Sequence, residues 1–183
     1  MLKVYITDLA AYNKGFLIGE WVTLPIEEIE LDLVLNKVLR GGEAICAMEY
    51  GYELHEEMFI SDYEWEDGIE LFEVEEYSNI VELNKNTEPL QGLSIQELKA
   101  VRFILDEGIT SDVNDAIKEL DDVIVYEDTT MVDLAYSILE DCYEVYKLPS
   151  IIANHIDYNE VARTLEYESR YTKVNDDIFE YIG

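Results

Sequence analysis

The stretch Lys3-Val4-Tyr5-Ile6-Thr7 predicts a β-strand, because its apolar and polar side chains alternate. The turn signal Asn13-Lys14-Gly15 follows, and residues 16–24 predict a second strand. We therefore expect the two strands to pair as a hairpin with a broad connection.

The next segment carries a helical pattern that starts beside Pro25, a residue suited to the first turn of a helix. Apolar residues recur at helical spacing over residues 26–38, and Gly41-Gly42 is predicted to end this helix. Short apolar runs at 44–48 and 58–60 predict two further strands.

Residues 79–122 predict helices. Ser94 with Glu97 forms a capping-box pattern in front of an apolar run. Thr110 or Ser111 is expected to cap a second helix.

The last third returns to mixed structure, because residues 123–126 predict a strand and residues 171–181 a closing hairpin. Between them, Thr130 with Asp133 is predicted to open a helix, and Ser150 and Asp157 to cap two shorter ones. The residues that the first of these helices is expected to bury are Val132, Ala135, Leu139 and Cys142.

These patterns together predict an α+β fold made of three small subdomains. We place an α+β subdomain at 1–78, a helical one at 79–122 and a second α+β subdomain at 123–183. No linker rich in Gly, Ser or Pro separates them, so they are expected to pack against one another.

The charge of the chain is its most unusual property. It has 42 Asp and Glu against 12 Lys and Arg, a formal net charge of −30. Solubility requires a magnitude of only about 2–8 in a small domain. The hydrophobic content of 49% separates the chain from disordered acidic tails. Such a charge argues against nucleic acid or an anionic membrane as a direct partner and favours basic surfaces.

The sequence offers few residues for catalysis or for metal binding. His55 and His155 are each expected to be surface or packing residues, because neither lies in a zinc-helix pattern. Residues 62–73 come nearest to a calcium loop, but Glu replaces Asp or Asn at its third and fifth positions and its Gly is one place late. We expect no enzymatic activity, no cofactor and no metal.

Cysteine usage and hydropathy bear on the compartment. Cys46 and Cys142 are far apart in the sequence and predict small buried thiols in a reducing environment. The start Met1-Leu2-Lys3-Val4-Tyr5 lacks a signal pattern, and no apolar run approaches the roughly 20 residues of a membrane span. A soluble, cytoplasmic protein is expected.

A folded array of carboxylates can imitate DNA. Duplex DNA carries one negative charge per about 1.7 Å, so thirty charges correspond to roughly 15 base pairs. A basic DNA-binding cleft would attract such a protein through steering and ion release. The protein would then inhibit by competition.

Three stretches resemble the ArdA antirestriction proteins. The first is Val4-Tyr5-Ile6-Thr7-Asp8-Leu9-Ala10-Ala11-Tyr12-Asn13-Lys14-Gly15 with Leu17-Ile18-Gly19-Glu20-Trp21. The second is Phe59-Ile60-Ser61-Asp62-Tyr63-Glu64, and the third runs from Leu148-Pro149 to Thr164-Leu165. They occur in the family's order and span nearly the whole chain. The stretch 40–57 and the acidic run to residue 76 look more extended than expected of the family.

The resemblance implies an elongated, curved protein of three subdomains that dimerises and mimics bent DNA. Such proteins are carried by mobile genetic elements and occupy the DNA site of type I restriction-modification enzymes, whose methyltransferase core is the expected partner. The antirestriction motif of the family, near its dimer interface, matches about residues 146–158. The residues expected to support a homodimer, or else to be ordinary core, are Leu148, Pro149, Ile152 and Ile156.

The DNA-mimic surface is assigned to the acids between 49 and 76, to the helix-end acids near 106–122 and to two further acids. They are Glu49, Glu53, Glu56, Glu57, Asp62, Glu64, Glu66, Asp67, Glu70, Glu73, Glu75, Glu76, Asp106, Glu107, Asp112, Asp115, Asp121, Asp122, Glu127 and Asp128. Two alternatives stay open. One is mimicry aimed at a CRISPR effector, a repressor or a nucleoid protein, and the other is an acidic calcium-binding or regulatory protein.

Overall fold

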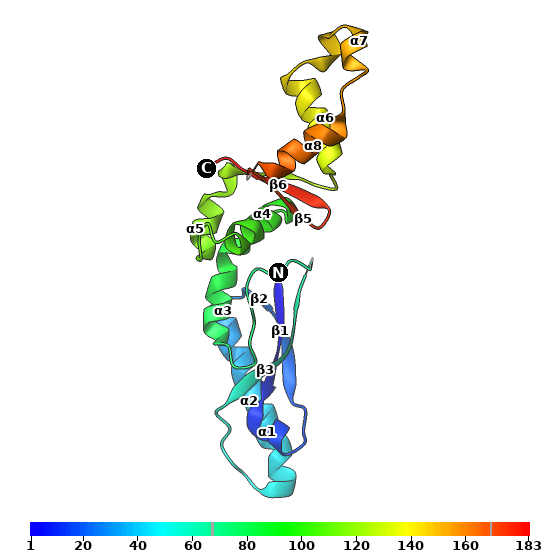
Figure 1. Ribbon diagram of the computed structural model, residues 1–183. Coiled ribbons are helices and arrows are strands. Elements are labelled where there is room, and N and C mark those ends of the chain that lie inside the picture. The colour runs from blue at the N-terminus through cyan, green and yellow to red at the C-terminus, as the bar shows by residue number, and fades with distance from the viewer. Residues whose placement is uncertain (67, 169) are drawn as a thin grey trace. The chain divides into compact units, whose positions relative to one another are not determined.

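The computed structural model describes residues 1–66, 68–168 and 170–183, and their contacts divide the chain into two compact units, Met1–Leu98 and Lys99–Gly183 (Figure 1). Each unit combines helices with an antiparallel sheet, which confirms the predicted α+β class. The division into three subdomains stays a prediction.

The elements of the first unit are β1 (Leu2–Asp8), α1 (Leu9–Asn13), β2 (Gly19–Leu24), α2 (Glu28–Tyr50), β3 (Met58–Trp65), α3 (Ile80–Thr87) and η1 (Glu88–Leu90), with α4 (Ile95–Asp106) crossing the boundary. The sheet has the order β2-β1-β3 with both pairs antiparallel, and Val4 lies opposite Val22 and Tyr63. The predicted pairing of the first two strands is confirmed.

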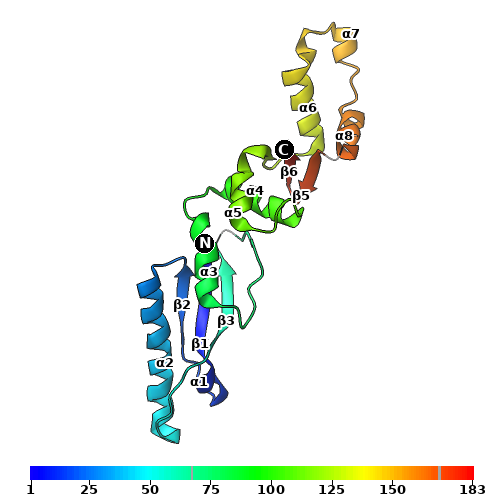
Figure 2. The same cartoon turned by 90° about the vertical axis from the view of Figure 1, so that its left-hand side faces the viewer.

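The core of the first unit lies between this sheet and α2, which packs against β1 and β2 (Figure 2). Alternation along β1 buries Leu2, Val4 and Ile6 completely. From the helix, Leu31 and Val38 are buried at helical spacing.

The sequence prediction is wrong about α2, which runs through Gly41-Gly42 to Tyr50, so residues 44–48 are helical. Glycine within a helix costs about 1 kcal/mol relative to alanine, which the packing of α2 outweighs. Gly42 lies against Asp8, and a Cβ there would overlap the Asp8 carboxylate. Gly42 therefore marks a close approach, and the glycine pair does not end the helix.

The second unit continues with α5 (Val113–Lys118), η2 (Leu120–Asp122), β4 (Val123–Tyr126), α6 (Met131–Cys142), η3 (Val145–Lys147), α7 (Ser150–Ala153), α8 (Tyr158–Tyr167), β5 (Tyr171–Val174) and β6 (Asp177–Tyr181). Its sheet has the order β4-β6-β5, all antiparallel, and includes the predicted closing hairpin. Helices α6 and α8 lie side by side, and α7 lies beyond the end of α6 that is away from the sheet (Figures 1 and 2).

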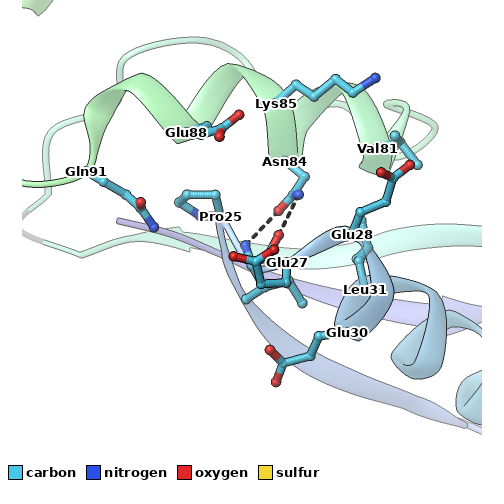
Figure 3. A pocket seen from close by; sticks show the side chains of 11 residues that line it. Pro25, Glu27, Glu28, Glu30, Leu31, Val81, Asn84, Lys85, Glu88 and Gln91 are labelled. Atoms are coloured by element: carbon cyan, nitrogen blue, oxygen red, sulfur yellow. Dashed lines mark hydrogen bonds between the residues drawn. The ribbon is translucent and has the colours of Figure 1, made fainter.

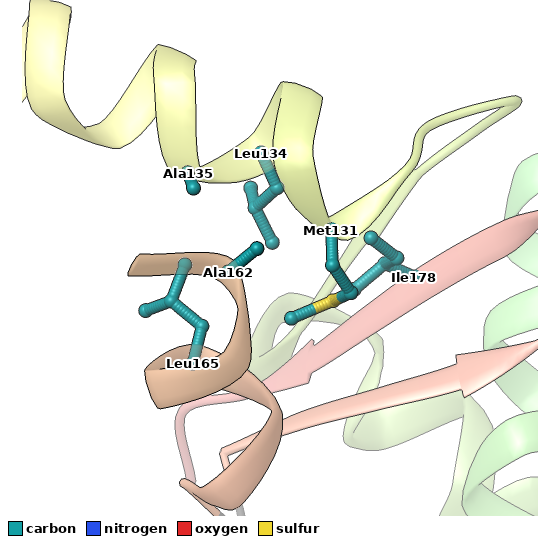
Figure 4. Close-up of a cluster of buried hydrophobic side chains, with 6 residues drawn as sticks. All are labelled: Met131, Leu134, Ala135, Ala162, Leu165 and Ile178. Carbon is teal, nitrogen blue, oxygen red and sulfur yellow. The ribbon is translucent and has the colours of Figure 1, made fainter. Parts of the chain in front are cut away.

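A cluster of apolar side chains joins α6, α8 and β6 in this unit (Figure 4). Its members are Met131, Leu134, Ala135, Ala162, Leu165 and Ile178. On the side of α4, Phe103 stacks on Phe179 with ring centroids 4.7 Å apart.

The predicted opening of α6 is confirmed, since Thr130 and Asp133 form a reciprocal capping box. The predicted buried face is partly wrong: Ala135 is buried, but Val132 and Cys142 are exposed and Leu139 is half-buried. Residues 131, 134 and 135 face the sheet and α8, so the buried face of α6 includes Met131 in place of Val132.

Three smaller predictions need correction. The side chain of Asp112 caps α5, in place of Thr110 or Ser111. Pro149 precedes α7 at the cap position, so Ser150 is the first helical residue. Both cysteines are free thiols, but only Cys46 is buried.

Candidate functional site

The acidic side chains assigned from sequence in the first unit follow three consecutive stretches. Glu49 lies in the last turn of α2, and residues 53, 56 and 57 lie in the connection to β3. Asp62 and Glu64 project from β3, and the remaining acids follow it up to residue 76. Apart from Glu66, which is half-buried, they are exposed; Asp67 is outside the residues that the structure describes.

The connection after β3 is held in place by apolar side chains between its acids. Leu71 and Val74 are buried, whereas Glu70, Glu73, Glu75 and Glu76 are exposed. The ring of Phe72 contacts Trp65 edge to face at 4.9 Å. The Ile60 N–H donates to the Glu76 carbonyl over 2.8 Å. The apolar residues thus fix an irregular segment whose carboxylates point outward.

In the second unit the assigned acids lie at element ends. Asp106 and Glu107 lie at the end of α4, Asp112 caps α5 and Asp115 lies in its first turn, and the other four flank β4. All are exposed except Asp122, which is half-buried. Acids at the C-terminal end of a helix oppose the helix dipole, so Asp106 and Glu107 are placed where local stability disfavours them.

Several of these carboxylates make ion pairs with the few cations. Lys14 binds Glu53 over 2.5 Å, Lys3 binds Glu64 over 3.0 Å and Glu66 over 3.2 Å, and Lys99 binds Glu127 over 2.9 Å. Exposed pairs of this kind contribute little to stability. The arrangement therefore leaves most of the negative charge uncompensated.

These ion pairs shift the pKa values of the groups that form them. The hydrogen bond from Lys14 lowers the pKa of Glu53, and the hydrogen bond from Lys3 lowers the pKa of Glu66. In return, bonds to Glu64 and Glu66 raise the pKa of Lys3. The Lys14–Glu53 and Lys3–Glu66 pairs therefore stay ionised at neutral pH.

A further group of acids, not predicted from the sequence, lines a hollow of about 510 Å³ at the start of α2 (Figure 3). Asn84 of α3 bridges its floor by bonding the backbone N–H and carbonyl of Ile26, both over 2.9 Å. Glu27, Glu28, Glu30 and Glu88 belong to its lining. The run of glutamates at a helix start was the available signal, but only the fold brings Glu88 to it.

The four residues assigned to a dimer interface lie in or beside η3 and α7. Leu148 and Ile152 have exposed fractions of 40% and 52%, Pro149 is exposed, and Ile156 is half-buried. Large apolar neighbours are exposed beside them: Tyr143, Tyr146 and Ile151. The same short stretch therefore presents a band of apolar side chains to solvent, which is typical of an interaction surface.

His55 is buried and bonds Asp8, whereas His155 is exposed. Asp62 and Glu64 lie on β3, where they face Tyr5 and Lys3 of β1, and not in a calcium loop. Over residues 1–66, 68–168 and 170–183, no His, Cys, Asp and Glu side chains are grouped so as to hold a metal ion. Within the same residues, no helix has both the length and the apolar character to cross a bilayer.

A comparison with protein families identifies one relationship. The family model described as "Antirestriction protein (ArdA)" matches residues 4–180. The match includes every described strand except the extreme ends of β1 and β6, together with all the acids discussed above. No curated protein matches the chain significantly.

Proposed function

The chain belongs to the ArdA family of antirestriction proteins, and we propose that it acts by occupying the DNA-binding site of type I restriction-modification enzymes. In this proposal its carboxylates take the place of DNA phosphates. The target is the methyltransferase core, which must hold DNA for either cleavage or methylation.

The observation that carries the proposal is the exposure of acids along both units. A net charge of −30 is placed mainly on surface side chains that are anchored by buried apolar neighbours. Like charges at this density repel one another and destabilise the fold. Retaining them is understandable when a basic cleft is the partner, because binding then gains from steering and from release of counterions.

Inhibition in this proposal is stoichiometric and non-enzymatic. A carboxylate array offers the target no phosphodiester to cut and no base to methylate, so the bound protein persists as a competitor. The site of action is the cytoplasm, where restriction enzymes meet incoming DNA.

We further propose a homodimer formed through Leu148, Pro149, Ile152 and Ile156. The exposed tyrosines and isoleucines of the same stretch support this assignment, because aromatic and aliphatic side chains gather at the centres of protein interfaces. Dimerisation would double the number of carboxylates offered to the target. The layout of three subdomains, 1–78, 79–122 and 123–183, belongs to the same proposal.

The test is competition with DNA. A type I methyltransferase core is bound to a labelled cognate duplex, and the purified protein is added at several salt concentrations. Displacement of the duplex at a fixed stoichiometry, weakening as salt rises, supports charge-based mimicry. Folded protein that displaces no duplex contradicts this target and directs the search to CRISPR effectors, repressors and nucleoid proteins.

A further inference from the structure

The connection between α2 and β3, residues 51–57, is an irregular segment with a single buried residue (Figure 1). Every residue in it is exposed except His55, whose side chain has no exposed surface. Even Tyr52 and Leu54 are 75% and 62% exposed. The segment therefore buries almost nothing else that could fix its position.

His55 is held by a bond to Asp8, the last residue of β1. The Nδ1 atom lies 2.6 Å from Asp8 Oδ2, and neither side chain is exposed. A carboxylate oxygen accepts hydrogen bonds, so the imidazole presents its Nδ1–H to Asp8. The other oxygen, Asp8 Oδ1, accepts the Ala11 N–H over 2.8 Å and caps α1.

The packing around this bond is tight on the side of α2. A Cβ on Gly42 would overlap the Asp8 carboxylate and lie 3.0 Å from His55 Nδ1, so α2 supplies a slot that only glycine allows. The backbone adds two further ties. The His55 N–H donates to Glu43 Oε1 over 3.2 Å, and the Leu9 N–H donates to the Glu57 carbonyl over 3.1 Å.

Acidic residues lie on both sides of this anchor. Glu53, Glu56 and Glu57 are exposed acids within two positions of His55, and Glu49 lies in the last turn of α2 just before the segment. Glu53 also meets Lys14 over 2.5 Å. The places of Glu53, Glu56 and Glu57, which belong to the irregular segment, thus depend on where His55 is held, whereas Glu49 is placed by α2.

We infer that Asp8 and His55 form a positioning pair that fixes the carboxylates of Glu53, Glu56 and Glu57 for the target enzyme, an inference that rests on the proposed function. A segment already ordered loses less conformational entropy when it binds. A buried polar pair is weak evidence for stability, because apolar replacements are often neutral. Its directional bond, however, holds one geometry, which an apolar contact does not.

The cost of the arrangement supports a role beyond packing. His55 Nε2 is buried and has no hydrogen-bond partner among the described residues. An unsatisfied buried nitrogen is unfavourable. A leucine at this position would avoid that cost but would not be directed at Asp8.

A double-mutant cycle separates positioning from folding. The cycle measures displacement of duplex from the methyltransferase core. It compares His55→Ala, a neutralised variant and the combination of the two. The neutralised variant carries Glu49→Gln, Glu53→Gln, Glu56→Gln and Glu57→Gln. His55→Ala is expected to weaken displacement about tenfold in the native background and less than about twofold in the neutralised one, because the carboxylates it positions are then gone. Equal losses in both backgrounds would overturn the inference.

Two further variants control for stability and for chemistry. His55→Asn retains an amide N–H that can reach Asp8 and is expected to restore most of the displacement. Val22→Ala, a core change in β2 remote in sequence from the segment, is expected to lower stability without affecting displacement. Loss of displacement in Val22→Ala, or no rescue by His55→Asn, would overturn the role of the pair.

Proteolysis tests the pair independently of the target. Chymotrypsin cleavage after Tyr52, which is exposed, is expected to accelerate about tenfold in His55→Ala and to stay at the wild-type rate in Val22→Ala, because only the former releases the segment. Wild-type protein that displaces no DNA would overturn the proposed function. Unchanged cleavage in His55→Ala would overturn the positioning pair.

Discussion

The Tyr126 hydroxyl donates a 2.6 Å hydrogen bond to Glu180 Oε2, a carboxylate that is only 3% exposed, and so ties β4 to β6. Arg170 binds the other oxygen of Glu180. Tyr126→Phe removes the donor and leaves a buried acceptor with one partner fewer. We expect the free energy of unfolding to fall by about 2 kcal/mol, measured by chemical denaturation. The control Tyr167→Phe, at a residue that is 90% exposed, should change little.

The same bond predicts a dependence on alkaline pH. Burial, with the bond to Glu180, raises the pKa of Tyr126 above its ordinary value of 10.0. Because the folded-state pKa is the higher one, the contribution of Tyr126 to stability is complete below pH 10 and declines as pH rises above it. The difference in stability between wild type and Tyr126→Phe should therefore shrink above pH 10. A difference that grows there would contradict this assignment.

The adjacent glycines of α2 should respond oppositely to alanine. A Cβ on Gly42 overlaps the Asp8 carboxylate, whereas a Cβ on Gly41 meets only Ile18 Cγ2 at 3.3 Å. Gly42→Ala is expected to lose about 1–3 kcal/mol of stability through overpacking. Gly41→Ala should be neutral or gain up to about 1 kcal/mol of helix propensity. Thermal unfolding followed by circular dichroism compares the two, and equal effects would show that Gly42 is not a contact site.

The glycines also illustrate what the sequence could and could not predict. Strands and capped helices could be predicted, because alternation at residues 3–7 and the capping box at Thr130 are local signals. The course of α2 could not be predicted, because Gly42 is required by its contact with Asp8, which lies 34 positions earlier in the chain. The face of α6 was misassigned by one position for a similar reason: only the packed α8 and β6 select Met131 over Val132.

The band around α7 should control self-association. Ile152→Asp places a charge among Tyr146, Leu148 and Ile151, which the proposed dimer would bury. We expect sedimentation of a monomer with an unchanged circular dichroism spectrum, because the side chain is exposed in the single chain. Leu17→Asp, at a residue that is 63% exposed in the first unit, should leave the dimer intact. Dimers that survive Ile152→Asp would place the interface elsewhere.

Salt should affect stability and inhibition in opposite directions. Raising the salt concentration from about 0.05 to about 0.5 M screens the repulsion among surface acids, so the midpoint of thermal unfolding should rise. Displacement of DNA should weaken over the same range. A midpoint that falls with salt would mean that ion pairs such as Lys3–Glu64 outweigh the repulsion.

The candidate site was only partly accessible from sequence. The exposure of the acids at 70–76 follows from their alternation with apolar residues, which is a local pattern. Neither the hollow beside Glu27 nor the bond between Asp8 and His55 could be anticipated, because each joins residues from separate elements. Charge can be counted in a sequence, but its positions come from the fold.

The central claim is that many carboxylates act together as a substitute for DNA phosphates, and graded neutralisation tests it most directly. Three sets of variants are compared for displacement of duplex over a range of salt. The first set consists of single changes such as Glu73→Gln, and the second is the group Glu49→Gln, Glu53→Gln, Glu56→Gln and Glu57→Gln. The third combines that group with Asp112→Asn, Asp115→Asn, Asp121→Asn and Asp122→Asn. We predict losses below about twofold for single changes, about tenfold or more for the groups, and a salt dependence that becomes shallower as carboxylates are removed. Complete loss of inhibition from one surface acid, or full inhibition by the most neutralised variant, would contradict the account.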